Sequence, residues 1–491
     1  MKKAIVTVDL GFGDSGKGTI TAALVKKYNS DLVVRYSGGF QAAHHVYPSD
    51  HVFHRFSQFG SGTFDGAKTL IGPNVIINPL TMQHEANRLV ELGVKDPMNL
   101  MHVDRRCIIA TPYHKALNRI REFSRRTRHG STGEGIGEAR RMSISREALT
   151  LRASELENES KVLHKIEWIA EQCALECHEL IHDYQLCGLD AIEAMAPFNE
   201  KSGMTKLMDR YKQWYSSVHI LSFINQQVLL ANSHVPVFEA AHGVLLDKRH
   251  GFHPYTTWSD TTDKPAWDML VDIYEPEEVY HIGITRTYMT RHGDGPFASE
   301  ITSNYIDAKE GAALIADDDN ASGQYQGSMR VGFHDLVALR YAQRCLKRPL
   351  DGLAVTHCDK LNYKAVRFIC TKYFGADLDN YKCEKEASLQ ALSFTGAYQA
   401  VQLSLEPVNP AEVPEFLAKG LGVPLVIKSF GKRTDQKVFM GMPQEDGFVD
   451  KKAAQTPTPD AAQTTAPATP EPAKADGTAP APTTTAPTTV N

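Results

Sequence analysis

The chain has 491 residues, of which 42% are hydrophobic and 23% are charged, and its formal net charge is −5. This composition is typical of a soluble globular protein and argues against bulk electrostatic binding to nucleic acid or to an acidic membrane surface. No apolar stretch approaches the roughly 20 residues that cross a bilayer. The sequence therefore predicts a cytoplasmic protein with no nucleic-acid or membrane partner.

Short β-rich segments alternate with helical ones along most of the chain. The strand-like runs lie at residues 4–8, 31–36, 235–241, 281–288, 352–359 and 422–430. Such runs, ending in small or polar residues and feeding helices, are typical of βαβ units around a mainly parallel sheet. Residues 145–235 carry apolar side chains at helical spacing, which predicts a helical insertion. We expect one large α/β domain over residues 1–445.

The last part of the chain, residues 450–491, is rich in Ala, Pro and Thr and contains no aromatic residue. Such a segment cannot bury enough apolar surface to offset the entropy of ordering, which predicts a disordered tail. Eight cysteines without a CxxC pair predict free thiols rather than a zinc site.

The first predicted strand leads into a glycine loop that departs from the P-loop pattern. Residues 9–19 read DLGFGDSGKGT, in which Gly11 and Gly16-Lys17 have the required spacing. However, Gly18 stands where the pattern needs a hydroxyl, and Asp14 lies inside the loop. Amides at a helix start favour phosphate, and Lys17 adds a positive charge. A carboxylate there can serve as a base or a magnesium ligand, or it can simply cap the following helix.

Three further stretches narrow the function: SGGFQAAHHV at 37–46, GSTGEGIG at 130–137 and FEAAHGVLLD at 238–247. With the first loop, they resemble the adenylosuccinate synthetase family, whose loops run GDEGKG, GGxNAGH, TTxxGIGPA and FEGAQGxLLD. The resemblance continues in the family's order through HPYTTWSDTT at 253–262, TRHGDGPFASE at 290–300, GFHDLVALR at 332–340 and THCD at 356–359.

The family ligates L-aspartate to C6 of a 6-oxopurine nucleotide and consumes a nucleoside triphosphate with Mg²⁺. By this resemblance, Asp14 is the base that removes the N1 proton and is also a ligand of Mg²⁺. His44 matches the histidine that stabilises the transferring phosphoryl group. Ala43 stands where a backbone carbonyl reaches the metal. In the family, an arginine from the region that corresponds to Arg140 and Arg141 reaches across a dimer. The resemblance therefore also implies a homodimer.

The resemblance assigns the other ligand contacts residue by residue. The triphosphate nucleotide, GTP or ATP, would contact Gly13, Ser15, Gly16, Lys17, Gly18, His357, Asp359, Ser429 and Gly431. The purine substrate, IMP or dGMP, would contact Gln41, Ser131, Thr132, Arg141, His242 and Thr257. Arg330 would pair with a carboxylate of L-aspartate.

Several positions depart from the family pattern. His242 replaces a Gln that touches the purine, and His357 replaces the Lys of the guanine-reading TKLD, so that ATP is credible beside GTP. The aspartate loop TTGRxRR is YQGSMRV at 325–331, in which only Arg330 remains. The phage branch that couples aspartate to dGMP has similar departures but carries Ser in place of the catalytic Asp. Asp14 therefore favours IMP, with dGMP as the alternative and a non-catalytic nucleotide-binding paralogue as a second one.

Overall fold

The computed structural model describes residues 3–125, 130–199, 203–301, 314, 327–375, 378 and 389–443. Two compact units are distinguished, Met1–Lys451 and Lys452–Asn491. The predicted disordered tail lies outside the described residues. Within the described ranges, no helix is long and apolar enough to span a bilayer.

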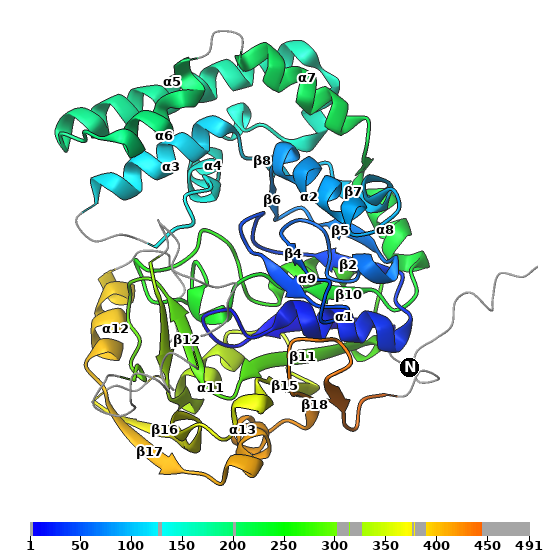
Figure 1. The fold of residues 1–491 in the computed structure, drawn as a ribbon, viewed down its shortest axis with the longest axis vertical. Helices are drawn as coiled ribbons and strands as arrows, with labels where there is room; N and C mark the ends of the chain where they lie inside the picture. Colours follow the sequence, from blue (N-terminus) through cyan, green and yellow to red (C-terminus); the bar gives the residue numbers. More distant parts are fainter. Residues whose placement is uncertain are drawn as a thin grey trace, which may run out of the picture. The chain divides into compact units, whose positions relative to one another are not determined.

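A ten-stranded sheet forms the centre of the first unit (Figure 1), with the strand order β19-β18-β15-β11-β1-β10-β2-β5-β7-β9. The strands are β1 (Ala4–Asp9), β2 (Leu32–Arg35), β5 (Lys68–Ile71), β7 (Met101–Asp104), β9 (His219–Leu221), β10 (Val237–Glu239), β11 (Val279–Arg286), β15 (Gly352–Thr356), β18 (Leu425–Ser429) and β19 (Lys437–Phe439). All neighbouring pairs are parallel except β18 and β19. The predicted α/β class with a mainly parallel sheet is confirmed.

The central strands of the sheet are buried on both faces, because helices pack against each face. Successive side chains of a strand point to opposite faces. Ile5 of β1 packs on one face, in the same core as Ile20 and Leu24. Its neighbours Ala4 and Val6 pack on the other face, in a separate core. The covering helices are α1 (Lys17–Tyr28), α2 (Pro79–Glu91), α8 (Phe223–Asn232), α9 (Lys264–Leu270), α11 (Leu336–Arg344) and α13 (Val413–Leu421).

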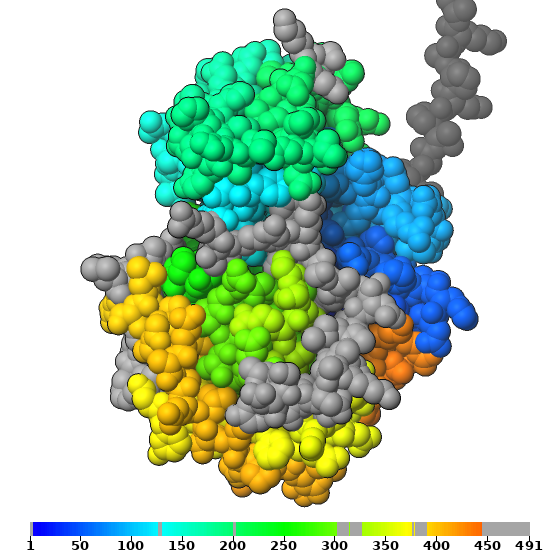
Figure 2. All heavy atoms as spheres, turned by 60° about the vertical axis from the view of Figure 1, so that its left-hand side comes forward, coloured from blue at the N-terminus to red at the C-terminus, as the bar shows by residue number. Residues whose placement is uncertain are grey.

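Five helices gather in a group of their own, drawn in cyan to green in Figures 1 and 2. They are α3 (Pro112–Ser124), α4 (Ile136–Ser145), α5 (Glu159–Asp183), α6 (Leu189–Asn199) and α7 (Gly203–Tyr215). Val162, Ile166, Ile169 and Cys173 of α5 enter their shared core at helical spacing. The helical insertion thus exists, but its helices begin before residue 145, and the predicted range also contains β9, which joins the main sheet.

Smaller sheets complete the unit. They are formed by β3 (His44–Val46) with β4 (His54–Phe56), β6 (Ile76–Ile77) with β8 (Ile108–Ile109), β12 (Met289–His292) with β13 (Met329–Gly332), and β14 (His334–Asp335) with β16 (Phe368–Phe374) and β17 (Gln402–Pro407). Helix α12 (Leu389–Gln399) precedes β17.

Candidate active site

The carboxyl ends of the parallel strands meet at one edge of the main sheet, where ligands bind in open α/β folds. A cavity of about 850 Å³ opens there. Of the residues expected to bind ligands, its lining contains Gly13, Asp14, Gly16, Lys17, Gly18, Gln41, Ala43, His44, Ser131, Thr132, His242, Thr257, His357, Asp359, Ser429 and Gly431. Ser15, Arg141 and Arg330 are not part of this lining.

The loop between β1 and α1 is organised by Asp9, the last residue of β1. Its buried carboxylate accepts hydrogen bonds from the amide of Gly11 (2.9 Å) and the hydroxyl of Ser15 (2.9 Å), and it pairs with Lys17 Nζ at 2.7 Å. Ser15 therefore turns inward. Helix α1 begins after Gly16, and no side chain of the described residues caps it. Asp14 is thus not a helix cap, and the free amides of the first turn leave an anion site.

Gly18 lies where α1 packs against β3. A Cβ atom at this position would come within 2.8 Å of His44 Cβ and 3.1 Å of the His45 carbonyl oxygen. The close approach explains why the P-loop hydroxyl is missing: the histidine strand occupies the space that Ser or Thr would need.

His44 contacts the buried carboxylate of Glu239, the last residue of β10. Its Nδ1 lies 2.6 Å from Glu239 Oε1, and Glu239 also accepts hydrogen bonds from the amide (3.1 Å) and hydroxyl of Ser61. Burial lowers the pKa of His44 to about 4, so the ring is neutral at pH 7. Nδ1–H donates to Glu239, while the buried Nε2 has no hydrogen-bond partner among the described residues.

Glu239 keeps its charge in this buried position. Burial by itself would raise its pKa, but His44, Arg35 and Ser61 together lower it to about 2. Glu239 was not among the predicted site residues. The sequence does contain a signal for Glu239, because this acidic residue directly follows the apolar run VPVF. A charged side chain in a buried strand is costly unless it has a partner.

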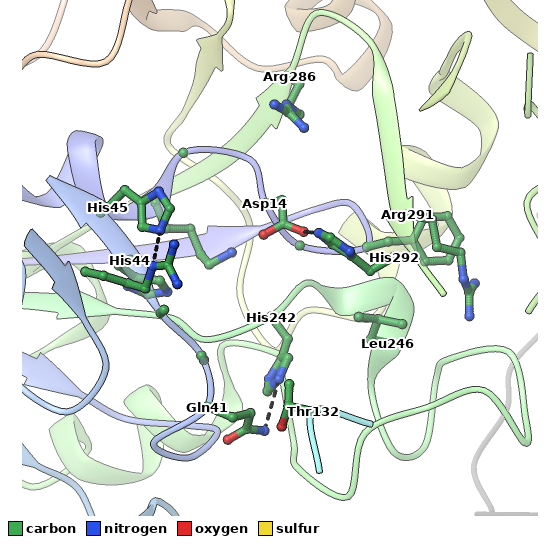
Figure 3. Close-up of a pocket in the computed structure, with 18 of the residues that line it drawn as sticks. Asp14, Gln41, His44, His45, Thr132, His242, Leu246, Arg286, Arg291 and His292 are labelled. Atoms are coloured by element: carbon green, nitrogen blue, oxygen red, sulfur yellow. Dashed lines mark hydrogen bonds and ion pairs between the residues drawn. The ribbon is translucent and has the colours of Figure 1, made fainter. Parts of the chain in front are cut away.

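Asp14 faces the cavity, in which His292 and His242 lie near it (Figure 3). Its backbone has a φ of 56°, its side chain is 37% exposed, and Oδ2 lies 3.5 Å from His292 Nε2. His242 Nε2 lies 3.3 Å from the side-chain nitrogen of Gln41. Burial, with a smaller effect of Lys17, lowers the pKa of His242 to about 4. His292, which the prediction did not include, stands where the family motif TRVG has Val.

The loop at 130–137 lies beside α3. Ser131 Oγ accepts a hydrogen bond from Asn118 Nδ2 (3.0 Å), and Asn118 Oδ1 accepts one from the amide of Gly135 (3.0 Å). Arg121 of α3 and Arg125, which directly follows the helix, contribute to the cavity lining. Neither was predicted, because both lie outside the glycine-rich motif.

Arg141 and Arg330, the two arginines predicted to bind ligands, form hydrogen bonds with carboxylates. Arg141 donates to Glu138 (2.9 Å) and to both oxygens of Glu176 (2.8 and 2.7 Å). Arg330 donates to Glu300 (2.8 Å) and to the carbonyl oxygens of Gly293 (3.0 Å) and Gly295 (2.9 Å). In this structure, both guanidinium groups are bound to protein partners.

Comparison with known proteins gives consistent results. The family model of adenylosuccinate synthetase matches residues 6–436. The adenylosuccinate synthetase of Francisella philomiragia is 30% identical over 403 residues, covering 77% of this chain and 85% of that protein. That of Thermosynechococcus vestitus is 29% identical and covers 89% of this chain and 95% of its own.

Two solved structures share the fold. Fully ligated adenylosuccinate synthetase from Plasmodium falciparum has a TM-score of 0.68 and 18% identity, covering 89% of this chain and 100% of that one. The succinoaminodeoxyadenylate synthetase of cyanophage S-2L, bound to dGMP and to dATP as an energy donor, has a TM-score of 0.55 and 14% identity, covering 91% and 97%. With a family match over nearly the whole described chain, the protein belongs to the adenylosuccinate synthetase family, whose members are carbon–nitrogen ligases of purine nucleotide biosynthesis.

Proposed function

We propose that this protein ligates L-aspartate to C6 of a 6-oxopurine nucleotide, with IMP as the favoured substrate, and hydrolyses a nucleoside triphosphate in the process. The observation that carries this proposal is that Asp14, Lys17 and His44 line one cavity at the carboxyl edge of the sheet. A base, a phosphate-binding cation and a proton donor are the groups that activation of a C6 oxygen requires.

The reaction proceeds in two steps. Asp14 removes the N1 proton, and the O6 oxygen attacks the γ-phosphorus, so that a 6-phosphoryl intermediate and a nucleoside diphosphate form. The amine of aspartate then attacks C6, phosphate leaves, and adenylosuccinate results from IMP. Asp14 suits the first step because its carboxylate faces the cavity and is 37% exposed, with His292 Nε2 3.5 Å from Oδ2.

His44 acts on the transferring phosphoryl group. In the free protein the His44 ring is neutral and Nε2 carries no proton. When a triphosphate binds, its negative charge and the Glu239 carboxylate at Nδ1 stabilise an imidazolium, whose Nε2–H points away from Glu239. Charge that builds up on O6 and on the phosphoryl oxygens is then met by this Nε2–H donor, whose orientation Glu239 fixes.

Mg²⁺ fits the oxygen donors that remain. Asp14 offers a partly exposed carboxylate and Ala43 a backbone carbonyl, both of which line the cavity. The described chain contains no cluster of three or more metal-binding side chains. A cation that uses few protein ligands and takes the rest from phosphates and water is typically Mg²⁺, which neutralises phosphate charge when bound.

dGMP is the second candidate for the purine substrate. His242 and its contact with Gln41 replace the family's Gln at the base, and a fold neighbour from cyanophage S-2L was solved with dGMP. A non-catalytic paralogue is disfavoured because Asp14, Lys17 and His44 are all present.

The test is phosphate release by the purified protein with Mg²⁺ and L-aspartate, for IMP or dGMP combined with GTP or ATP. We expect aspartate-dependent turnover in at least one of the four combinations. Asp14→Ala and His44→Ala should each abolish it while the melting temperature stays close to that of the wild type. Turnover near the wild-type rate in either variant would contradict the mechanism, and no turnover in any combination would contradict the function.

A further inference from the structure

Six Lys or Arg side chains are buried in the described part of the chain: Lys17, Arg35, Lys165, Arg286, Arg291 and Lys437. Three of them lie within 4.0 Å of a carboxylate, namely that of Asp9, Glu239 or Glu155. Arg286, Arg291 and Lys437 have no such partner among the described residues. Since an uncompensated buried charge is costly, each needs another source of negative potential.

Backbone carbonyl groups supply this potential for two of the three. Arg291 donates to the carbonyl oxygens of Pro296 (2.8 Å) and Tyr255 (3.1 Å). Lys437 donates to those of Gly431 and Arg433, both at 2.6 Å. Arg286 is different, because among the described residues its side chain contacts only the Thr290 hydroxyl, the His357 ring and the face of Tyr288.

The contacts of Arg286 are neutral in every case. Nη1 donates to Thr290 Oγ1 at 2.8 Å, Nη2 lies 2.6 Å from His357 Nε2, and the guanidinium carbon lies 4.8 Å from the centre of the Tyr288 ring. Burial and the charges of Arg286, Lys360 and Lys437 hold the pKa of His357 well below its usual value, so the imidazole is uncharged. Arg286 is only 4% exposed, yet it forms part of the cavity lining.

The position of Arg286 points to one side of the cavity. It is the last residue of β11 and pairs in register with Thr356, the last residue of β15. Thr356 Oγ1 donates to the Ser15 carbonyl oxygen (3.0 Å) in the first glycine loop and lies 2.8 Å from His357 Nδ1. Figure 3 shows Arg286 on the opposite side of Asp14 from Gln41 and Thr132, two of the residues expected at the purine substrate.

We propose that Arg286 binds a phosphate group of the nucleoside triphosphate, an inference that rests on the proposed function. The guanidinium supplies a buried cation beside the first glycine loop, to which it is linked through Thr356 and the Ser15 carbonyl oxygen. Its fork of N–H donors suits phosphate oxygens, and its orientation is fixed in advance by Thr290, Tyr288 and His357. A carboxylate of L-aspartate is also an oxyanion and is the alternative ligand of Arg286. The test distinguishes it from a phosphate of the triphosphate.

The test uses the full chain and two variants of Arg286. Arg286→Gln keeps an amide donor for His357 but removes the charge, and Arg286→Lys keeps the charge without the fork. The control is Arg348→Met, which removes an exposed arginine that also lies over an aromatic ring, that of Trp267, outside the cavity lining. Kd is measured for ATP and for GTP with Mg²⁺ and no other substrate, and KM is measured for L-aspartate.

We expect Arg286→Gln to weaken binding of the preferred triphosphate by about 10- to 100-fold, as loss of a charge-assisted hydrogen bond does, with KM for aspartate changed less than threefold. Arg286→Lys should recover part of this loss, and Arg348→Met should bind as the wild type does. An unchanged triphosphate Kd in Arg286→Gln overturns the proposal, and so does a loss confined to KM for aspartate, which would place the amino donor's carboxylate at Arg286.

Different binding results would contradict the role of Arg286 and the proposed function. A wild-type protein that binds ATP or GTP, together with an Arg286→Gln variant that binds it equally well, overturns the role of Arg286 alone. A wild-type protein that binds neither nucleotide overturns both. If Arg286→Gln does not fold, Arg286→Lys decides the matter: we expect its affinity to fall about 3- to 10-fold, and an unchanged affinity overturns the proposal.

Discussion

At the scale of single residues, Glu239 determines which nitrogen of His44 faces the cavity. A neutral imidazole carries one proton, and the carboxylate 2.6 Å from Nδ1 holds it there, so that Nε2 is directed away from β10. The same carboxylate would stabilise the ring once a second proton arrives. Glu239 is therefore a positioning residue, which acts on substrate through His44.

Replacement of this charge gives a specific prediction. Glu239→Gln preserves the size of the side chain and a hydrogen-bond acceptor but not the negative charge, so we expect kcat to fall about 100-fold while KM for the triphosphate changes little. Steady-state kinetics would measure both. Ser61→Ala is the matched control, because it removes one hydrogen bond to Glu239 and leaves its charge; its loss should be tenfold smaller or less. A wild-type kcat in Glu239→Gln would show that the charge has no part in the reaction.

At the scale of secondary-structure elements, the site depends on the packing of α1 against β3. Gly18 has no space for a side chain, since a Cβ atom would meet His44 at 2.8 Å. The first turn of α1 and the histidine strand can approach this closely only at glycine. The missing hydroxyl of the P-loop pattern is thus a consequence of where His44 must lie.

Gly18→Ser would restore the P-loop hydroxyl and, for the same reason, should impair the enzyme. Overpacking costs about 1–3 kcal/mol, and the displaced His44 should lower kcat at least tenfold. Thermal denaturation and phosphate release would report the two effects. Gly396→Ser in α12 is the control, because a Cβ atom there meets no described residue within 4 Å. We therefore expect unchanged kcat and a free energy of unfolding that is equal or slightly higher. Equal behaviour of the two variants would contradict the packing argument.

The elements that the sequence predicted well are those with local signals. Apolar runs that end in glycine loops predicted the parallel strands, and these loops brought Asp14, Lys17 and His44 into one cavity. Contacts between distant residues had no such signal. Nothing near Arg141 in the sequence indicates that Glu176 binds it, and nothing near Arg286 indicates that the strand before His357 lies beside it. These contacts depend on the helical packing and on strand order, which periodicity does not specify.

At the scale of the whole molecule, buried histidines connect stability to pH. His114 is 3% exposed, and burial, with a smaller effect of Arg141, lowers its pKa to about 3. Burial likewise lowers the pKa of His334 to about 3, and those of His44 and His242 are lowered to about 4. In the unfolded chain, each would titrate near 6.5. Between about pH 6.5 and pH 4 the unfolded state therefore binds more protons, and stability must fall as pH falls.

His114 offers the cleanest test of this linkage. Its Nδ1 accepts a hydrogen bond from the amide of Thr111 at 3.0 Å, at the start of α3, so protonation of Nδ1 would both charge a buried ring and remove a cap. At pH 5 such a group lowers the free energy of unfolding by about 2 kcal/mol relative to pH 7. Asp335 works in the opposite direction, because burial raises its pKa to about 6 and the folded state takes up that proton first.

His114→Asn isolates this one contribution, since the Asn side-chain oxygen can accept the same amide hydrogen bond and does not titrate. We expect the wild type to lose free energy of unfolding between pH 7 and pH 5, and the variant to lose about 2 kcal/mol less. Urea denaturation at the two pH values measures both differences, and Asp335 cancels in the comparison because it is present in each protein. The same pH dependence in both proteins would mean that His114 is protonated in the folded state without cost, and that its burial does not link stability to pH.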